Sequence, residues 1–134
     1  MDITTLIATL RADYHRFPEN PTFSIYAEEV YFKDPLTEFR GLRQYQQMIS
    51  FMQRWFQAVR LELHDLTAEF PLITTRWTLS WITPLPWRPR IHISGRSELL
   101  LNEAGLITSH IDYWDCSVVN VLRQHFSWPQ KKAG

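Results

Sequence analysis

The sequence contains a single cysteine, Cys116, among its 134 residues. A lone cysteine excludes an internal disulfide and is typical of proteins from a reducing compartment. No apolar run approaches the ~20 residues of a membrane-spanning helix, and the N-terminus is periodic rather than a charged segment followed by an apolar one. We therefore expect a cytoplasmic protein with no membrane partner.

An excess of charge of one sign is also missing, because 14 basic residues balance 14 acidic ones. Such a chain has no long-range field to attract nucleic acid, so we expect no nucleic-acid partner. Only four glycines are present and none forms a phosphate-binding loop, which argues against a nucleotide cofactor. His64, His92 and His110 lie on separate predicted strands without the spacing of a metal site. The sequence predicts neither a cofactor nor a metal site.

The N-terminal half carries helical patterns. Apolar residues recur at steps of three and four over residues 3–16, with Asp2 as the N-cap, and again over residues 42–56. Both segments are predicted to be amphipathic helices. Between them we expect a short helix over residues 23–30 and an extended turn over residues 31–35.

The second half is rich in β-branched and aromatic residues that alternate with period two. This pattern predicts four consecutive antiparallel strands, over residues 60–70, 73–83, 90–102 and 105–116. A short closing helix is expected over residues 118–126. Helices first and strands afterwards predict one α+β domain over residues 1–134, with the N-terminal helices covering one face of a curved sheet.

The segment HIDYWDC at residues 110–116 combines acids, a base and aromatic rings. Because alternate side chains of a strand face opposite ways, His110, Asp112 and Trp114 share one face. A carboxylate facing an aromatic pocket is suited to acid/base chemistry, which makes Asp112 the principal candidate and His110 its proton-exchanging neighbour. Asp115 and Ser117 both stand where the closing helix begins, and we assign the N-cap to Asp115.

The strand at residues 73–83 leaves two orientations open. Trp77 and Trp81 share one face, and Arg76 lies on the other. If Arg76 faces the cavity, the two indoles point outward and form an apolar surface that a monomer exposes poorly, which predicts a homodimer. If the tryptophans face inward, they line the pocket and the arginine is solvated.

The order of these elements, together with YFKDPLTEFRG at residues 31–41 and GLITSHIDYWD at residues 105–115, resembles the nuclear transport factor 2-like superfamily. This superfamily is also called SnoaL-like or ketosteroid isomerase-like, and the likeness extends over most of the chain. More narrowly, the pattern is similar to a family of photosynthetic lineages known as domain of unknown function 2358. The resemblance implies a cone-shaped sheet but no single activity, because the superfamily includes isomerases, cyclases, epoxide hydrolases and dimerisation modules.

Comparison with the limonene-type epoxide hydrolases of this superfamily adds residue-level expectations. Asp112 falls on their water-activating aspartate, Arg76 on the arginine that orients it, and Tyr31 on their tyrosine. This correspondence favours the orientation in which Arg76 faces the cavity. Thr78 and Lys33 replace an expected acid and an expected asparagine, which argues against epoxide hydrolysis.

We expect the cone to bind a small apolar or aromatic molecule, with turnover left open. The catalytic candidates are Asp112 and His110. The ligand-binding candidates are Arg76, Tyr31, Tyr26 and Trp114, of which the tyrosines come from the segment that overlooks the cavity in ketosteroid isomerase-like folds. The alternative is a non-catalytic interaction or dimerisation module that docks a partner through aromatic residues, including Trp87. A cavity of ligand size favours the first hypothesis, and a packed interior favours the second.

Overall fold

The structure is a computed structural model that describes residues 2–126. It is an α+β domain, as predicted. In chain order, the elements are α1 (Ile3–Arg16), a 3-10 turn (Phe23–Ile25), β1 (Tyr26–Lys33), β2 (Glu38–Arg40), α2 (Leu42–Trp55), β3 (Gln57–Glu69), β4 (Leu72–Ile82), β5 (Arg90–Leu101), β6 (Ile107–Trp114) and α3 (Val118–Gln124). None of the helices in the described part of the chain is long and apolar enough to cross a membrane.

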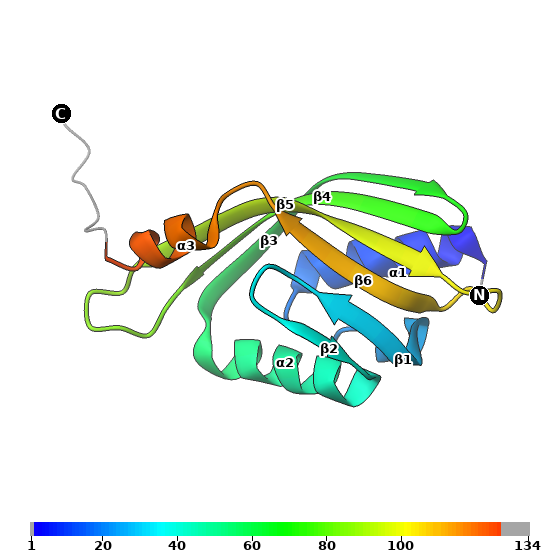
Figure 1. Cartoon of the computed structure of the whole chain (residues 1–134), viewed down its shortest axis with the longest axis horizontal. Helices are drawn as coiled ribbons and strands as arrows, with labels where there is room; N and C mark the ends of the chain where they lie inside the picture. The colour runs from blue at the N-terminus through cyan, green and yellow to red at the C-terminus, as the bar shows by residue number, and fades with distance from the viewer. Residues whose placement is uncertain (1, 127–134) are drawn as a thin grey trace.

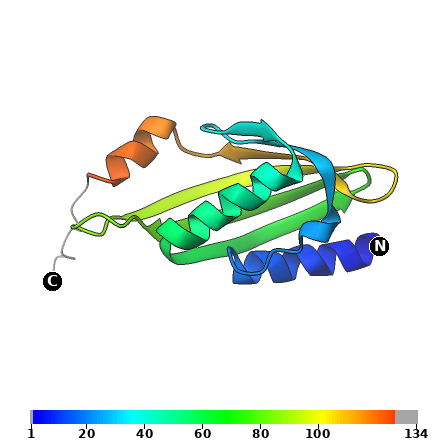
Figure 2. The same cartoon turned by 90° about the horizontal axis from the view of Figure 1, so that it is seen from below.

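The strands form one curved, open sheet in the order β2-β1-β6-β5-β4-β3 (Figure 1). Strands β3 to β6 pair antiparallel with their neighbours in sequence, as predicted, whereas β1 pairs with β6 in parallel. Helix α2 lies across one face of the sheet and α1 runs beside β3 (Figure 2). We call the face toward these two helices the inner face and the opposite one the outer face.

The two long helices form where the sequence predicts them. The Oδ1 atom of Asp2 accepts a hydrogen bond from the backbone N–H of Thr5 at 2.8 Å and so caps α1. Leu10 of α1 is buried, as are Tyr45 and Ile49 of α2. These side chains sit on the apolar stripes of the two helices and form a core with the inner face of the sheet.

The predicted helix over residues 23–30 is wrong, because this segment is a 3-10 turn followed by β1. The register of β1 against β6 shifts between Tyr26 and Tyr31. As a result Glu28 and Glu29 are both exposed, whereas Val30 is fully buried. The shift interrupts the alternation of buried and exposed side chains that identifies a strand. The apolar residues of the segment are then spaced as in a helix.

The tryptophans of β4 face inward, contrary to the orientation that the Arg76 comparison favoured. Trp77 and Trp81 are 5% and 6% exposed, whereas Arg76 is exposed. Gly95 on β5 makes room for this packing. A Cβ atom at Gly95 would lie 2.3 Å from the carbonyl oxygen of Tyr113 and 3.2 Å from the Trp77 ring. The reason given for a homodimer is therefore wrong, and the dimer itself remains a prediction.

Helix α3 is confirmed, but its N-cap is Ser117 and not Asp115. The Ser117 side chain accepts a hydrogen bond from the backbone N–H of Asn120 at 3.0 Å. Asp115 is exposed and its backbone N–H donates to the carbonyl of Ser94 at 2.8 Å, which continues the β5 pairing beyond β6. Asp115 therefore ends the strand, and Ser117 begins the helix.

This assignment predicts different effects of two alanine substitutions. Ser117→Ala removes the capping oxygen and should lower the free energy of unfolding by about 1 kcal/mol. Asp115→Ala keeps the backbone bond to Ser94 and should change it by less than about 0.5 kcal/mol. Urea unfolding of both variants measures the difference, and a larger cost for Asp115→Ala would contradict the assignment.

Candidate functional site

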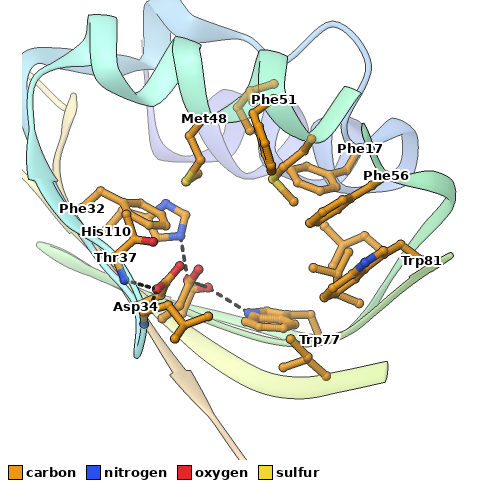
Figure 3. A pocket seen from close by; sticks show the side chains of 18 of the residues that line it. Phe17, Phe32, Asp34, Thr37, Met48, Phe51, Phe56, Trp77, Trp81 and His110 are labelled. Carbon is orange, nitrogen blue, oxygen red and sulfur yellow. Dashed lines mark hydrogen bonds and ion pairs between the residues drawn. The ribbon is translucent and has the colours of Figure 1, made fainter. Parts of the chain in front are cut away.

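A cavity of about 440 Å³ lies between the inner face of the sheet and the three helices. Most of its wall is aromatic and apolar. The rings that Figure 3 labels are Phe17, Phe32, Phe51, Phe56, Trp77 and Trp81. The volume is in the range of small-molecule sites, which typically measure ~300–1,000 Å³.

A chain of hydrogen bonds crosses β4, β5 and β6 at one end of the cavity. The indole Nε1 of Trp77 donates to Ser97 Oγ at 2.8 Å, and Ser97 Oγ donates to Asp112 Oδ1 at 2.5 Å. His110 Nε2 lies 2.8 Å from the same carboxylate oxygen. An indole nitrogen only donates and a serine carries one proton, so the serine proton must point to Asp112. We assign the His110 proton to Nε2, because Asp112 Oδ1 is already the acceptor of the Ser97 proton.

Asp34 adds a second carboxylate at this end of the cavity (Figure 3). Its Oδ1 atom accepts hydrogen bonds from the backbone N–H groups of Leu36 and Thr37, both at 2.7 Å. Burial raises the pKa of Asp34, and the negative charge of Asp112 raises it further, against the opposing effects of those two hydrogen bonds and of His110. Asp34 thus holds the turn between β1 and β2 and also faces the cavity.

The end of the cavity near α3 contains a similar chain. Trp81 Nε1 donates to Thr83 Oγ1 at 3.0 Å, and Thr83 Oγ1 lies 2.9 Å from His125 Nε2. His125 Nδ1 lies 2.9 Å from the Val121 carbonyl, which only accepts. These contacts fit a neutral imidazole with its proton on Nδ1. In both chains the indole edge is bonded to a hydroxyl, and both rings line the cavity.

Three tyrosines add hydroxyl groups to the wall, of which Tyr26 and Tyr45 are buried and Tyr14 is half-buried. Tyr14 OH lies 2.9 Å from Thr75 Oγ1, and burial raises the pKa of Tyr14 to about 12. The hydroxyls of Tyr26 and Tyr45 are 3.3 Å apart, and burial raises the pKa of both. All three phenols stay protonated near neutral pH and can donate hydrogen bonds.

The structure brings four of the six predicted site residues to the cavity. His110, Asp112 and Trp114 from β6 line its wall together, and Tyr26 from β1 lines it too. His110 and Tyr26 are each 8% exposed. Sharing one face of β6 is what strand parity predicted for the first three residues.

Arg76 and Tyr31 do not line the cavity. Arg76 is exposed on the outer face, where it stands opposite Asp65 of β3 and Arg96 of β5. Tyr31 donates its hydroxyl proton to Glu38, and the guanidinium of Arg40 lies 5.2 Å from the Tyr31 ring centre. The expectation that Arg76 orients Asp112 is corrected here, because Ser97 and His110 contact that carboxylate instead.

Sequence reasoning missed three contributors to the site. Asp34 falls within the turn predicted over residues 31–35, and its place before Pro35 gives no sign of a second role. Ser97 sits at an ordinary strand position. Trp77 was left with two possible faces, and the epoxide hydrolase comparison favoured the outer one, although the glycine that makes room for its ring is visible in the sequence at Gly95. Among the residues that the structure describes, no group of three metal-ligating side chains is arranged to hold an ion.

Solved structures share this fold over nearly the whole chain. A hypothetical protein with a ketosteroid isomerase-like fold from Catenulispora acidiphila, in complex with trimethylamine, superposes with a TM-score of 0.72 at 16% identity, covering 92% of this chain and 93% of that one. TsrD from Streptomyces laurentii gives 0.72 at 20% identity, with 92% and 96% covered. An LEH-like epoxide hydrolase from M. tuberculosis gives 0.70 at 16% identity, with 90% and 89% covered. The fold is that of the nuclear transport factor 2-like and SnoaL-like class.

Within that class, the chain belongs to the family described as "Uncharacterized conserved protein (DUF2358)", whose model matches residues 4–110. The match includes α1, α2, most of the sheet and His110, and it ends before Asp112 and α3. No protein of curated function matches the sequence.

The raised pKa of Asp34 predicts how stability changes with pH. A carboxyl with a raised pKa binds its proton more tightly in the folded state. Below the unfolded pKa near 3.8 its ionisation does not change the free energy of unfolding, and as pH rises through the folded pKa the charged form destabilises the fold. Asp34→Asn keeps an oxygen for the N–H groups of Leu36 and Thr37 and removes the charge. The variant should therefore gain stability relative to the wild type as pH rises from about 3 to 7.

Asp2→Asn is the matched control of opposite sign. The backbone N–H of Thr5 lowers the pKa of Asp2, so the charge at this position stabilises the fold above the unfolded pKa and this contribution is lost as pH falls. Asp2→Asn should lose stability relative to the wild type as pH rises. Urea unfolding at several pH values measures both trends, and parallel curves for Asp34→Asn and the wild type would refute the assignment.

Proposed function

We propose that the protein binds a small apolar or aromatic molecule in the cone cavity, with the carboxylate of Asp112 as the acceptor that orients it. The single observation that carries this proposal is a ligand-sized aromatic cavity whose wall includes a hydrogen-bonded carboxylate. Apolar walls with a few fixed polar groups are the usual composition of small-molecule sites.

The geometry of Asp112 supports this role. Its Oδ1 atom accepts from Ser97 and contacts His110, which holds the carboxylate in one orientation. Within residues 2–126, no hydrogen bond engages Oδ2. Because the residue lines the cavity, this second oxygen is the acceptor offered to a ligand. A ligand with an O–H, N–H or acidic C–H group matches it.

The same arrangement supports acid/base chemistry. Asp112 accepts two hydrogen bonds and is the candidate general base, with His110 bonded to it. Asp34, whose pKa burial raises, is a second carboxyl at the same end of the cavity and takes up a proton more readily than an exposed aspartate. Two carboxyl groups in unlike environments are a recurring basis for acid and base roles. Solved neighbours include an epoxide hydrolase and a complex with trimethylamine, which supports a ligand-holding cone.

The alternative of an interaction or dimerisation module has less support. It relied on outward tryptophans, and Trp77 and Trp81 are buried inside the protomer. Trp87, the other aromatic docking candidate, is half-buried and donates its indole N–H to the carbonyl of His125. These rings are already packed within the domain, so ligand binding is the function we propose.

The test compares two probes that differ by one donor. 2-Naphthalenemethanol carries a hydroxyl, and 2-(methoxymethyl)naphthalene lacks it. In Asp112→Asn, the amide oxygen keeps the contacts with Ser97 and His110, but an NH2 group replaces the free acceptor. We expect the variant to bind the alcohol about tenfold more weakly and the ether no more weakly, because a hydrogen bond to a charged group contributes ~1.5–3 kcal/mol.

Calorimetric titration measures both affinities, and a thermal melt checks that the variant remains folded. Met52→Trp, which fills the cavity from α2, should block both probes, whereas Met52→Leu should block neither. Severe destabilisation by Asp112→Asn together with unchanged affinity for the alcohol would show that Asp112 is a structural hydrogen-bond centre, and the proposal would fail.

A further inference from the structure

We infer that the cavity selects ligands that carry a protonated amine, with the ammonium group placed against the carboxylates of Asp34 and Asp112. This inference rests on the proposed function and adds the charge class of the ligand. It rests on two observations, which are the sign of the charged side chains along the wall and the hydrogen bonding of the two wall histidines.

The charges along the wall have one sign. Four acids line the cavity, at positions 13, 19, 34 and 112, and no lysine or arginine does so anywhere in the part of the chain that the structure describes. Asp13 is neutralised by Arg16 at 2.5 Å and also accepts hydrogen bonds from Thr22. No lysine or arginine within residues 2–126 forms an ion pair with Asp34 or Asp112. An anionic ligand would meet like charge here, and a cationic one would meet its counter-charge.

Neither histidine of the wall supplies the missing positive charge. His110 is 8% exposed, and its Nδ1 atom is buried without a hydrogen-bond partner in the described chain. Protonation would turn Nδ1 into a buried donor with no acceptor, which costs free energy. His125 has both nitrogens engaged in a pattern that fits the neutral ring. The negative charge of the cluster is therefore left for a ligand to balance.

The two carboxylates lie side by side at the same end of the cavity, because β1 and β6 pair in parallel with Phe32 opposite His110 and Lys33 opposite Ile111, and the two aspartates come next. Asp112 raises the pKa of Asp34 and His110 lowers it, and His110 is bonded to Asp112. Figure 3 shows Asp34 and His110 facing the cavity from the same end. Asp34 and Asp112 each use only Oδ1 toward the described residues. An ammonium group has three donors and can bind both free Oδ2 atoms.

Aromatic rings beside the cluster suit a cation. The ring centre of Phe32 lies 5.0 Å from that of His110, and the ring centre of Tyr45 lies 6.2 Å away. Both rings line the cavity. Aromatic faces attract cations, and the attraction is stronger away from water. The carboxylates bind the charge, and the rings pack around its alkyl or aryl substituents.

The experiment uses three naphthalenes that share one ring system and differ in charge at neutral pH. They are 2-(aminomethyl)naphthalene, 2-naphthalenemethanol and 2-naphthoate, which are cationic, neutral and anionic. Calorimetric titration of the full chain should give a dissociation constant at least tenfold lower for the amine than for the alcohol. The naphthoate should bind at least tenfold more weakly than the alcohol.

Variants locate the source of this preference. Asp112→Asn and Asp34→Asn should each reduce the ratio of amine to alcohol affinity by at least threefold, and the double variant should abolish it. Glu28→Gln removes an exposed acid of β1 that does not line the cavity, and it should leave the ratio unchanged. Thermal melts confirm that each variant is folded before it is titrated.

The outcomes separate the two proposals. If the alcohol binds and the amine binds no more tightly, or if the naphthoate binds best, the charge inference is overturned and the proposed function stands. If none of the three probes binds to the folded protein, the proposed function and the inference both fail. An amine preference that survives in the double variant would also overturn the inference, because its source would lie outside the two carboxylates.

Discussion

The hydrogen bonds that run from the Trp77 indole through Ser97 to Asp112 determine the character of the cavity. An indole nitrogen can only donate and a serine has one proton, so each bond in this chain has one direction. The chain therefore ends on an oxygen that accepts. His110 bonds to the same oxygen, and this contact fixes the orientation of its ring. The hydrogen bonds that begin at the Trp77 indole thus engage Oδ1 of Asp112 and leave Oδ2 for a ligand.

These hydrogen bonds require β4, β5 and β6 to pack closely around Gly95. Trp77 lies directly opposite Gly95 in the β4–β5 pair, and Gly95 lies opposite Trp114 in the β5–β6 pair. A side chain at Gly95 would collide with the carbonyl of Tyr113. The missing Cβ leaves room for the backbone of β6 and for the Trp77 ring. The polar chain and the apolar wall are thus consequences of the same glycine.

Much of this arrangement could be predicted from the sequence, because periodicity reports local geometry. Alternation along residues 105–116 placed His110, Asp112 and Trp114 on one face, and they share one wall of the cavity. Periodicity does not tell which face of a strand is the inner one. The comparison with epoxide hydrolases predicted Arg76 on the inner face. In the structure the β4 tryptophans occupy that face, and Arg76 lies on the outer one.

Other features depended on contacts between segments that are far apart in sequence. The segment at residues 23–30 was misassigned because a register shift against β6 exposes two successive glutamates and hides the strand pattern. Asp34 satisfies a local turn completely through Leu36 and Thr37, so nothing in its neighbourhood signals a second role. That role appears only when β1 and β6 pair in parallel and bring the turn beside His110 and Asp112.

The energetics of this cluster differ from those of a site kept only for stability. A buried carboxylate costs free energy unless a cation or enough donors compensate it. Asp13 shows how the chain compensates such a group, with Arg16 and Thr22 both bonded to it. Asp34 and Asp112 instead keep one oxygen each without a partner among the described residues, and the raised pKa of Asp34 reflects that incomplete compensation. A ligand that binds the two unpartnered oxygens removes this free-energy cost. Its binding therefore stabilises the folded state, and the cost that is removed contributes to the affinity.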